Sequence, residues 1–291
     1  MLLGIEHINI YRYTRLVELT NHKLMLRPAE SHEVQIRSEC LEIDPAHVLR
    51  WEHDVFYNSI ALVNFTDKAD ELRISSRYTV EQFNINPFNF VLEIYTNDLP
   101  FDYQGSEAAD LAPYLTQHHP DDTPAIKEWV KPFLDSNGRG KTLEFLLALN
   151  ESVPKQFGYS RRDEPGVQTP AETLQTRSGT CRDFALLFME AARYMGLAAR
   201  YVSGYLCSSD ADKPDIASDA THAWTEIYLP GAGWKGFDPT SGILAAGLHV
   251  RVAAAREPSQ ATPIRGSYLG DATLFREMEV TVNARVVPAK T

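Results

Sequence analysis

Cys181 opens a stretch of the chain that combines a nucleophilic side chain with a predicted helix start. Small and polar residues precede it at 178–180, and later residues of the stretch are mostly apolar, apart from Glu190 and Arg193. This pattern predicts a buried helix, for which Gly196 is a suitable stop. A thiol at a helix N-terminus lies beside unpaired backbone N–H groups, which favour the nucleophilic thiolate. Taken alone, the pattern is equally typical of a buried structural cysteine.

A predicted β-hairpin at residues 222–238 carries a histidine and an aspartate on one face. If its turn sets Tyr228 opposite Ala232, the same register sets His222 directly opposite Asp238. Side chains opposed in this way have Cβ atoms about 4.5–5.5 Å apart. A slip of one residue would place the two on opposite faces, so the pairing depends on the register.

These three residue types together could perform nucleophilic catalysis. An imidazole held by a carboxylate keeps one orientation and leaves its second nitrogen free to take a proton. If the helix packs its first turn on the hairpin, Cys181 would be the nucleophile, His222 the base and acid, and Asp238 the orienting group. A structural histidine with a turn aspartate is the simpler alternative. A zinc site at the same residues is a third, although a single cysteine without CxxC or HxxH spacing is a poor zinc signature.

Two predicted parts of the chain would position these residues, which makes the fold class α+β. Residues 1–105 contain short runs of alternating apolar and polar residues, including one at 90–96, and turn signals separate them. Such spacing without helices predicts an N-terminal antiparallel β-sandwich-like domain. Residues 106–291 would form the second domain, and the polar, proline-bearing stretch at 118–124 lies near the junction.

Helices are predicted ahead of the cysteine. The first is predicted at residues 123–135, with Thr123 as its candidate N-cap and a proline at its first helical position. Residues 140–157 predict a second helix that ends before Pro154, and Thr169–Pro170 could start a short helical turn.

Composition and charge narrow the functional classes. The 291-residue chain carries a net charge of −11, which argues against a nucleic-acid partner. It has no run of about eighteen apolar residues, and its first residues do not resemble a signal peptide, so we expect no membrane association. Cys40, Cys181 and Cys207 have no motif spacing, which predicts free thiols and a cytoplasmic location. Cys207, in a predicted strand at 198–208, is expected to be structural.

Metal and cofactor sites are not indicated. Histidines of the first half are scattered, and the acidic segment at 209–220 lacks the glycine and closing glutamate of a calcium loop. We therefore expect no cofactor and no metal. The sequence gives no indication of the oligomeric state.

The chain resembles the transglutaminase-like superfamily of papain-like thiol enzymes, in its bacterial branch with an N-terminal β domain. The matching segments are HINIYRY (7–13), HKLMLRP (22–28), HDVFYN (53–58), RSGTCRDFA (177–185), ARYVSGYL (199–206), HAWTEIYLPGAGWKGFDPT (222–240) and HVRVAAAREPSQATPIRG (249–266). The resemblance implies a papain-like core in which the cysteine helix packs on an antiparallel sheet. It also implies Cys181 as nucleophile, His222 as base and Asp238 as orienting group.

The resemblance further implies the class of reaction. The acyl donor would be a carboxamide or peptide bond of a peptide, a protein or a small amide, and the thioester formed on the cysteine would be resolved by water or an amine. Protease, deamidase and transglutaminase types stay open. The alternatives are a non-catalytic binding module that retains the fold and a metal-dependent hydrolase at the same residues.

Three positions depart from the pattern of this branch. Arg182 stands where glutamine is common, Tyr57 where glycine is common, and Glu257–Pro258 where an aspartate-aromatic pair is common. None of them removes a member of the candidate triad. A cation at residue 182 could favour the thiolate or select an acidic substrate.

Overall fold

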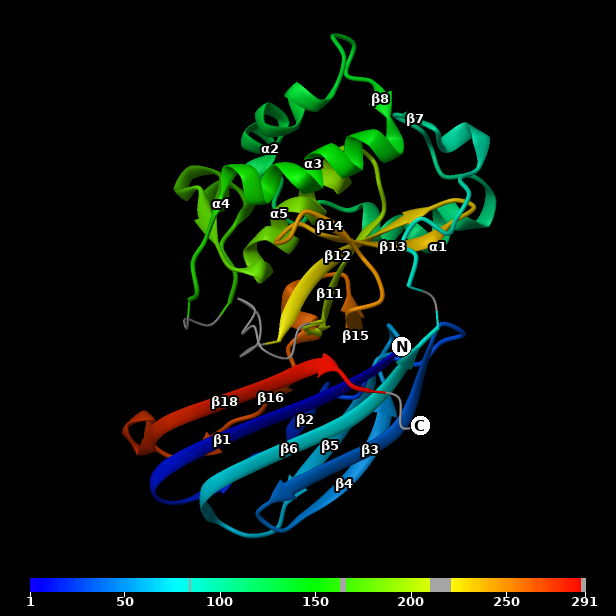
Figure 1. Ribbon diagram of the computed structural model, residues 1–291. Coiled ribbons are helices and arrows are strands. Elements are labelled where there is room, and N and C mark those ends of the chain that lie inside the picture. The colour runs from blue at the N-terminus through cyan, green and yellow to red at the C-terminus, as the bar shows by residue number, and fades with distance from the viewer. Residues whose placement is uncertain (84, 163–165, 210–220, 289–291) are drawn as a thin grey trace.

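The structure is a computed structural model that describes every residue except 84, 163–165, 210–220 and 289–291 (Figure 1). The predicted acidic segment at 209–220 therefore lies almost wholly outside the described residues. Strands occupy most of the first 82 residues: β1 (Leu2–Leu19), β2 (His22–Leu24), β3 (Val34–Asp44), β4 (His47–His53), β5 (Ser59–Phe65) and β6 (Ala69–Gln82).

These strands form two antiparallel sheets together with strands from the end of the chain. The late strands are β16 (Ile264–Arg265), β17 (Tyr268–Leu269) and β18 (Phe275–Val286). One sheet has the order β17-β1-β6-β3, with β18 also paired to β1, and the other has the order β16-β2-β5-β4. Apolar side chains from both sheets meet in one core, among them Leu24, Val63, Leu72 and Ile74. Two sheets that pack face to face bury the apolar side chains of their alternating strands.

The run at 90–96 is not a strand, contrary to the prediction. Residues 94–96 form a short 3-10 helix, η1 (Ile94–Thr96), and the side chains of Val91 and Ile94 are 80% and 86% exposed. Alternation predicts a strand only where a neighbouring strand supplies hydrogen bonds, and none of the described strands pairs with this run.

The helices of the second part cover a sheet, as Figure 1 shows. They are α1 (Gly105–Leu115), α2 (Thr123–Val130), α3 (Thr142–Gln156), α4 (Pro170–Thr176) and α5 (Cys181–Tyr194). Short 3-10 helices are η2 (Pro120–Asp122), η3 (Lys131–Phe133), η4 (Pro258–Ala261) and η5 (Ala272–Leu274). In the described part of the chain, no helix has the length and apolar character needed to cross a bilayer.

Several predicted helix boundaries are wrong by a few residues. Helix α2 ends at Val130 and not at residue 135. Asp122 rather than Thr123 precedes the first residue of α2. Helix α3 continues through Pro154 to Gln156. Pro154 lies in the last turn of α3, where its missing N–H costs one hydrogen bond and no later turn depends on it. The short helix predicted at Thr169–Pro170 is confirmed as α4, with Thr169 as its N-cap.

The sheet of the second part has the order β14-β13-β12-β11-β15. Its strands are β11 (Ala199–Leu206), β12 (His222–Leu229), β13 (Gly233–Asp238), β14 (Ile243–Ala245) and β15 (His249–Ala255). Two-residue pairings add β7 (Asp98–Leu99) with β8 (Gly140–Lys141) and β9 (Gly158–Tyr159) with β10 (Ser178–Gly179). Helix α5 packs on this sheet and is buried along nearly its whole length. Most of its side chains are apolar, and its buried charged side chains have partners.

The α+β class with a strand-rich N-terminal domain is thus confirmed. The division into 1–105 and 106–291 stays a prediction, but strand pairing places the last strands with the first part. Strand β18 runs antiparallel to β1, from Val286 opposite Leu3 to Phe275 opposite Tyr13. In Figure 1 the red β18 accordingly lies beside the dark blue β1.

Candidate active site

Cys181 is the first residue of α5 and is 7% exposed. The N–H groups of Cys181 and Arg182, at the first two helical positions, have no acceptor among the described residues. Such orphan donors at a helix start point toward any negative charge that forms beside them. The predicted helix and its stop are both confirmed, since Gly196 follows the C-cap with a φ of 78°.

Asp183 ties the first turn of α5 to segments that precede the cysteine in the chain, a role that was not predicted from the sequence. Its buried carboxylate accepts hydrogen bonds from the N–H and hydroxyl of Thr180, at 2.8 and 2.9 Å. It also accepts from Arg162 Nη2 at 2.8 Å and from the N–H of Gln168 at 2.7 Å. The spacing Thr180-x-x-Asp183 at a helix start was the available signal, because an acidic residue at that position often caps a helix.

The hairpin of β12 and β13 brings His222 to Asp238 in a register that differs from the predicted one. Tyr228 faces Trp234 rather than Ala232, a shift of two residues. An even shift keeps both side chains on the same face of the sheet, whereas an odd one would have separated them. His222 Nε2 donates to Asp238 Oδ2 at 2.9 Å, so the two meet as diagonal rather than opposed neighbours.

The turn explains the corrected register. Gly231 and Gly233 have φ values of 87° and 73°, and Ala232 N–H donates to the carbonyl of Leu229 at 2.8 Å. The turn therefore comprises residues 230–232, and Gly233 closes it in the left-handed conformation that three-residue hairpin loops require. The prediction had started this turn one residue earlier.

Asp238 is buried and receives several hydrogen bonds. Besides His222, its Oδ2 accepts from Ser241 Oγ at 2.7 Å and from His249 Nε2 at 3.1 Å, and its Oδ1 accepts from Thr240 N–H at 3.0 Å. Burial alone would raise the pKa of this carboxyl, but the two histidines outweigh it and hold the pKa well below its usual value. Asp238 is therefore a carboxylate at neutral pH.

The pKa of His222 is raised in this setting. Burial lowers the pKa of its imidazole, but the charge of Asp238, the hydrogen bond to Asp238 and a side-chain hydrogen bond with Cys181 together raise that pKa to about 10. Because Nε2 is bonded to Asp238, Nδ1 is the nitrogen left for the sulfur. Helix α5 is tied to β12 by Thr225, whose hydroxyl donates to the carbonyl of Ala185 at 2.7 Å.

His249 was not singled out from the sequence as a site residue, yet it lies in this cluster. His222, Asp238 and His249 are the group of described residues whose side-chain atoms lie close enough for a metal ion, within 4.8 Å of one another. Cys181 is not a member of that group. The Nε2 atoms of both histidines donate hydrogen bonds to Asp238 Oδ2, so these atoms already have hydrogen-bond partners within the cluster.

The other two cysteines lie elsewhere. Cys207, next to the end of β11, is buried, and burial raises the pKa of its thiol to about 12. Cys40 is half-buried on β3, where Arg77 Nη2 lies 3.5 Å from its sulfur. In the described residues, which include all three cysteines, none forms a disulfide.

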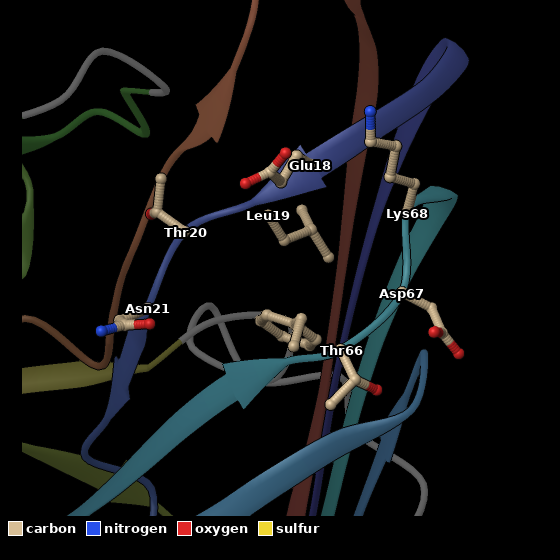
Figure 2. A pocket seen from close by; sticks show the side chains of 8 residues that line it. Glu18, Leu19, Thr20, Asn21, Thr66, Asp67 and Lys68 are labelled. Atoms are coloured by element: carbon tan, nitrogen blue, oxygen red, sulfur yellow. The ribbon is translucent and has the colours of Figure 1, made fainter.

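A cavity of about 590 Å³ lies in the N-terminal domain and does not include any of the candidate catalytic residues. It lies between the end of β1 and the turn from β5 to β6 (Figure 2). Its walls are Glu18, Leu19, Thr20, Asn21, Phe65, Thr66, Asp67 and Lys68. It thus offers no thiol or imidazole.

Comparison with known proteins shows the family of the chain. The sequence model of the transglutaminase-like superfamily matches residues 133–239. The sequence model of the bacterial transglutaminase-like N-terminal region matches residues 3–81. The uncharacterized protein Rv2569c of Mycobacterium tuberculosis is 30% identical over 275 residues, which cover 90% of this chain and 86% of the relative. The chain belongs to the transglutaminase-like superfamily.

Two further similarities extend over much of this transglutaminase-like chain. YebA of Bacillus subtilis is 25% identical over 232 residues, which cover 75% of this chain and 28% of YebA. The crystal structure of a candidate cysteine protease from Cytophaga hutchinsonii superposes with a TM-score of 0.71 at 18% identity, covering 100% of this chain and 92% of that one. At this identity the match shows that the two proteins share the fold.

The structure explains one of the departures from the family pattern. Tyr57 has a φ of 65°, a left-handed conformation that glycine adopts without strain, and its ring stacks on His53 with centroids 4.4 Å apart. Glu257 instead caps η4 and lies near His118. Arg182 donates through Nη2 to the carbonyl of Arg162 at 3.3 Å, beside the nucleophile.

Proposed function

We propose that this chain catalyses thiol-dependent acyl transfer or hydrolysis at a carboxamide or peptide bond. The observation that carries the proposal is a buried group of three side chains: Cys181 at the start of α5, and His222, whose Nε2 donates to Asp238 at 2.9 Å. Cys181 lies close enough to contribute to the raised pKa of His222. A raised pKa of His222 beside a thiol favours an imidazolium–thiolate pair, the reactive form of a cysteine nucleophile. Membership of the superfamily and the shared fold with a candidate cysteine protease support the same chemistry.

Each step of the reaction has a group to perform it. The Cys181 thiolate attacks the carbonyl carbon, and the negative charge moves to the carbonyl oxygen, where the N–H groups at the start of α5 can stabilise it. The C–N bond then breaks as the His222 imidazolium gives its proton to the leaving amine, which forms the thioester. Water or an amine, deprotonated by the now neutral His222, attacks the thioester and releases the sulfur.

The surroundings of the reaction are part of the proposal. Cys40 and Cys207 are free thiols, as Cys181 is. Three free thiols favour a reducing compartment such as the cytoplasm. The substrate would be a peptide, a protein or a small amide. The acidic net charge of −11 favours partners other than nucleic acid or an anionic membrane surface.

Alkylation by iodoacetamide as a function of pH tests the proposal. The three cysteines are separated by mass spectrometry of their peptides, so Cys40 and Cys207 serve as internal controls in the same sample. Cys181 should react well below the range near pH ~8.5 in which an ordinary thiol reacts, and His222→Ala should remove that advantage. If Cys181 reacted only in that ordinary range and His222→Ala left its reaction unchanged, the proposal would be wrong.

Trapping the acyl-enzyme gives the substrate class. The protein is incubated with a library of peptides and quenched in acid, and the mass added to the Cys181 peptide is measured. In a parallel reaction that is not quenched, an alkylamine is supplied with the peptides, and the mass of the released product distinguishes transfer to the amine from hydrolysis by water. Cys181→Ala is the matched control and should take up no mass.

A further inference from the structure

His249 is hydrogen-bonded to the same aspartate that holds the imidazole of His222. It is the first residue of β15, and its Nε2 lies 3.1 Å from the same oxygen, Asp238 Oδ2, that accepts from His222 at 2.9 Å. All three side chains are buried. A carboxylate oxygen is only an acceptor, so His249 must be the donor in this bond.

Contacts on the other sides of His249 leave its ring little freedom. Its Nδ1 faces the carbonyl of Ala246 at 3.3 Å, and its ring packs edge-to-face on Trp224, with centroids 5.3 Å apart. Its own carbonyl accepts a hydrogen bond of 2.8 Å from the side chain of Gln82, the last residue of β6 in the N-terminal domain. Gln82 is in turn held by reciprocal backbone contacts with Met1.

The N-terminal domain supports the whole strand that His249 begins. Strand β15 is an edge of the core sheet, and its outward backbone groups would otherwise be unpaired. Asn58 accepts from Ala254 N–H and donates to Ala254 carbonyl, both at 2.9 Å, and Ala29 N–H donates to Arg251 carbonyl at 2.8 Å. The N-terminal domain therefore covers this edge along its length.

We infer that His249 is a positioning residue: it fixes Asp238, and through Asp238 the imidazole of His222, in the orientation that the reaction needs. The N-terminal domain holds His249 in turn, and so contributes to the active site without touching the reacting atoms. This inference rests on the proposed function, since it assigns His249 a part in the same chemistry.

The contribution of His249 is directional. With the carboxylate held by Ser241 and Thr240 alone, Asp238 could rotate away from His222, because those two residues follow it directly in the chain and share its loop. His249 reaches Asp238 from a different strand and so fixes the oxygen against the sheet. An orienting group of this kind acts by keeping the imidazole in one tautomer and one direction.

Two amide variants form a matched pair for the test. The side-chain nitrogen of glutamine reaches the position of a histidine Nε2, whereas that of asparagine reaches only the position of Nδ1. His249→Gln should therefore keep the hydrogen bond to Asp238, and His249→Asn should lose it while its polarity stays similar. His22→Asn, at a buried histidine that contacts the carbonyl of Thr20, is the control for the loss of a buried imidazole elsewhere.

The first readout is the rate of Cys181 alkylation by iodoacetamide from pH 5 to pH 10 in the full chain. The titratable side chains around His249 include Asp238 and His222. Glu151 and the Met1 amine are also near, because Glu151, Met1 and His249 line one cavity of about 520 Å³. We expect His249→Asn to slow alkylation at pH 7 about tenfold, as for a lost hydrogen bond to a charged group. His249→Gln and His22→Asn should leave the rate within about twofold of wild type.

The second readout does not need a reactive thiol. In a Cys181→Ala background, the ¹⁵N shifts of the His222 ring report its tautomer and protonation, and they should move in His249→Asn but not in His249→Gln. If wild-type Cys181 reacts like an ordinary thiol, the proposed function fails, while these shifts still test the positioning. If the glutamine and asparagine variants behave alike in both readouts, the inference about His249 is overturned, whatever the state of the thiol.

Discussion

At the scale of single residues, the pairing of His222 with Asp238 has a consequence for stability that can be measured against pH. The pKa of His222 is raised to about 10 in the folded protein, so this group stabilises the fold fully below its unfolded pKa near ~6.5, and the contribution is lost as the pH rises toward 10. The pKa of Asp238 is lowered, so its contribution is present above its unfolded pKa near ~3.9 and is lost in acid.

Asp238→Asn should therefore destabilise the protein most between about pH 4 and pH 6.5. The difference in free energy of unfolding between wild type and variant should shrink by an amount on the order of a few kcal/mol as the pH approaches 10. Urea denaturation at several pH values measures this difference. A difference that stayed constant from pH 5 to pH 10 would mean that His222 is neutral in the folded protein.

The sequence predicted the three residues of the candidate triad but not His249. Cys181 stands at a recognisable helix start, and His222 and Asp238 share a hairpin, so local patterns are sufficient to bring them into consideration. His249 lies on a strand that enters the sheet beyond β11, and only the strand order places it near Asp238. Contacts between strands that are not neighbours in sequence have no local signal in one chain.

At the scale of elements, helix α5 carries a buried ion pair that sets its position on the sheet. Glu190 Oε1 accepts from Arg193 Nη1 at 2.7 Å, and both side chains are fully buried. Glu190 Oε2 accepts from the N–H groups of His118 and His119, and Arg193 donates to three backbone carbonyls. In the sequence these two residues were only polar interruptions of an apolar helix, because their partners lie in distant segments.

Removing one partner of this pair should be costly. Glu190→Ala leaves the guanidinium of Arg193 buried without its carboxylate and should lower the free energy of unfolding by about 3–5 kcal/mol. The double variant Glu190→Leu with Arg193→Met removes both charges and should recover a large part of that loss. Chemical denaturation of the three proteins checks the order, and a single variant as stable as wild type would contradict it.

The turn from β4 to β5 offers a test of the unusual Tyr57 backbone. Tyr57 has a φ of 65° and its ring stacks on His53. Tyr57→Gly and Tyr57→Ala both lose the ring, but only glycine relieves the left-handed conformation. The glycine variant should therefore be more stable than the alanine variant by about 1 kcal/mol in thermal or urea unfolding. Equal stabilities would show that the backbone at this position relaxes to a negative φ.

The register of the hairpin is one of the element-level features that sequence reasoning predicted wrongly. The face shared by His222 and Asp238 was correct, because alternation fixes it, but the pairing was off by two residues. Two glycines in the turn, Gly231 and Gly233, decided the closure, and their positive φ values depend on the folded turn. The same reasoning predicted a strand at 90–96, where alternation is present but a neighbouring strand is not.

At the scale of the whole molecule, the two parts of the chain are joined more closely than a linker would join them. The last strands return to the N-terminal sheets, and Asn58 ties the turn before β5 to β15 of the core. Asp54 holds Asn58 in place, since its carboxylate accepts from the N–H and the side-chain amide of Asn58 at 2.8 and 2.9 Å. The N-terminal domain therefore completes the core sheet instead of standing apart from it.

Asn58→Ala tests this connection. Without the amide, the N–H and carbonyl of Ala254 lose their partner at a buried position, which should cost about 1–3 kcal/mol in free energy of unfolding. Hydrogen exchange should show the amides of β15 exchanging faster, with the change centred on Ala254, and Cys181 alkylation should slow because His249 begins the same strand. Asn21→Ala, in the cavity of Figure 2, is the control and should change none of the three measurements. If β15 kept its protection in Asn58→Ala, the core would hold this edge without the N-terminal domain, and the support we assign to that domain would be wrong.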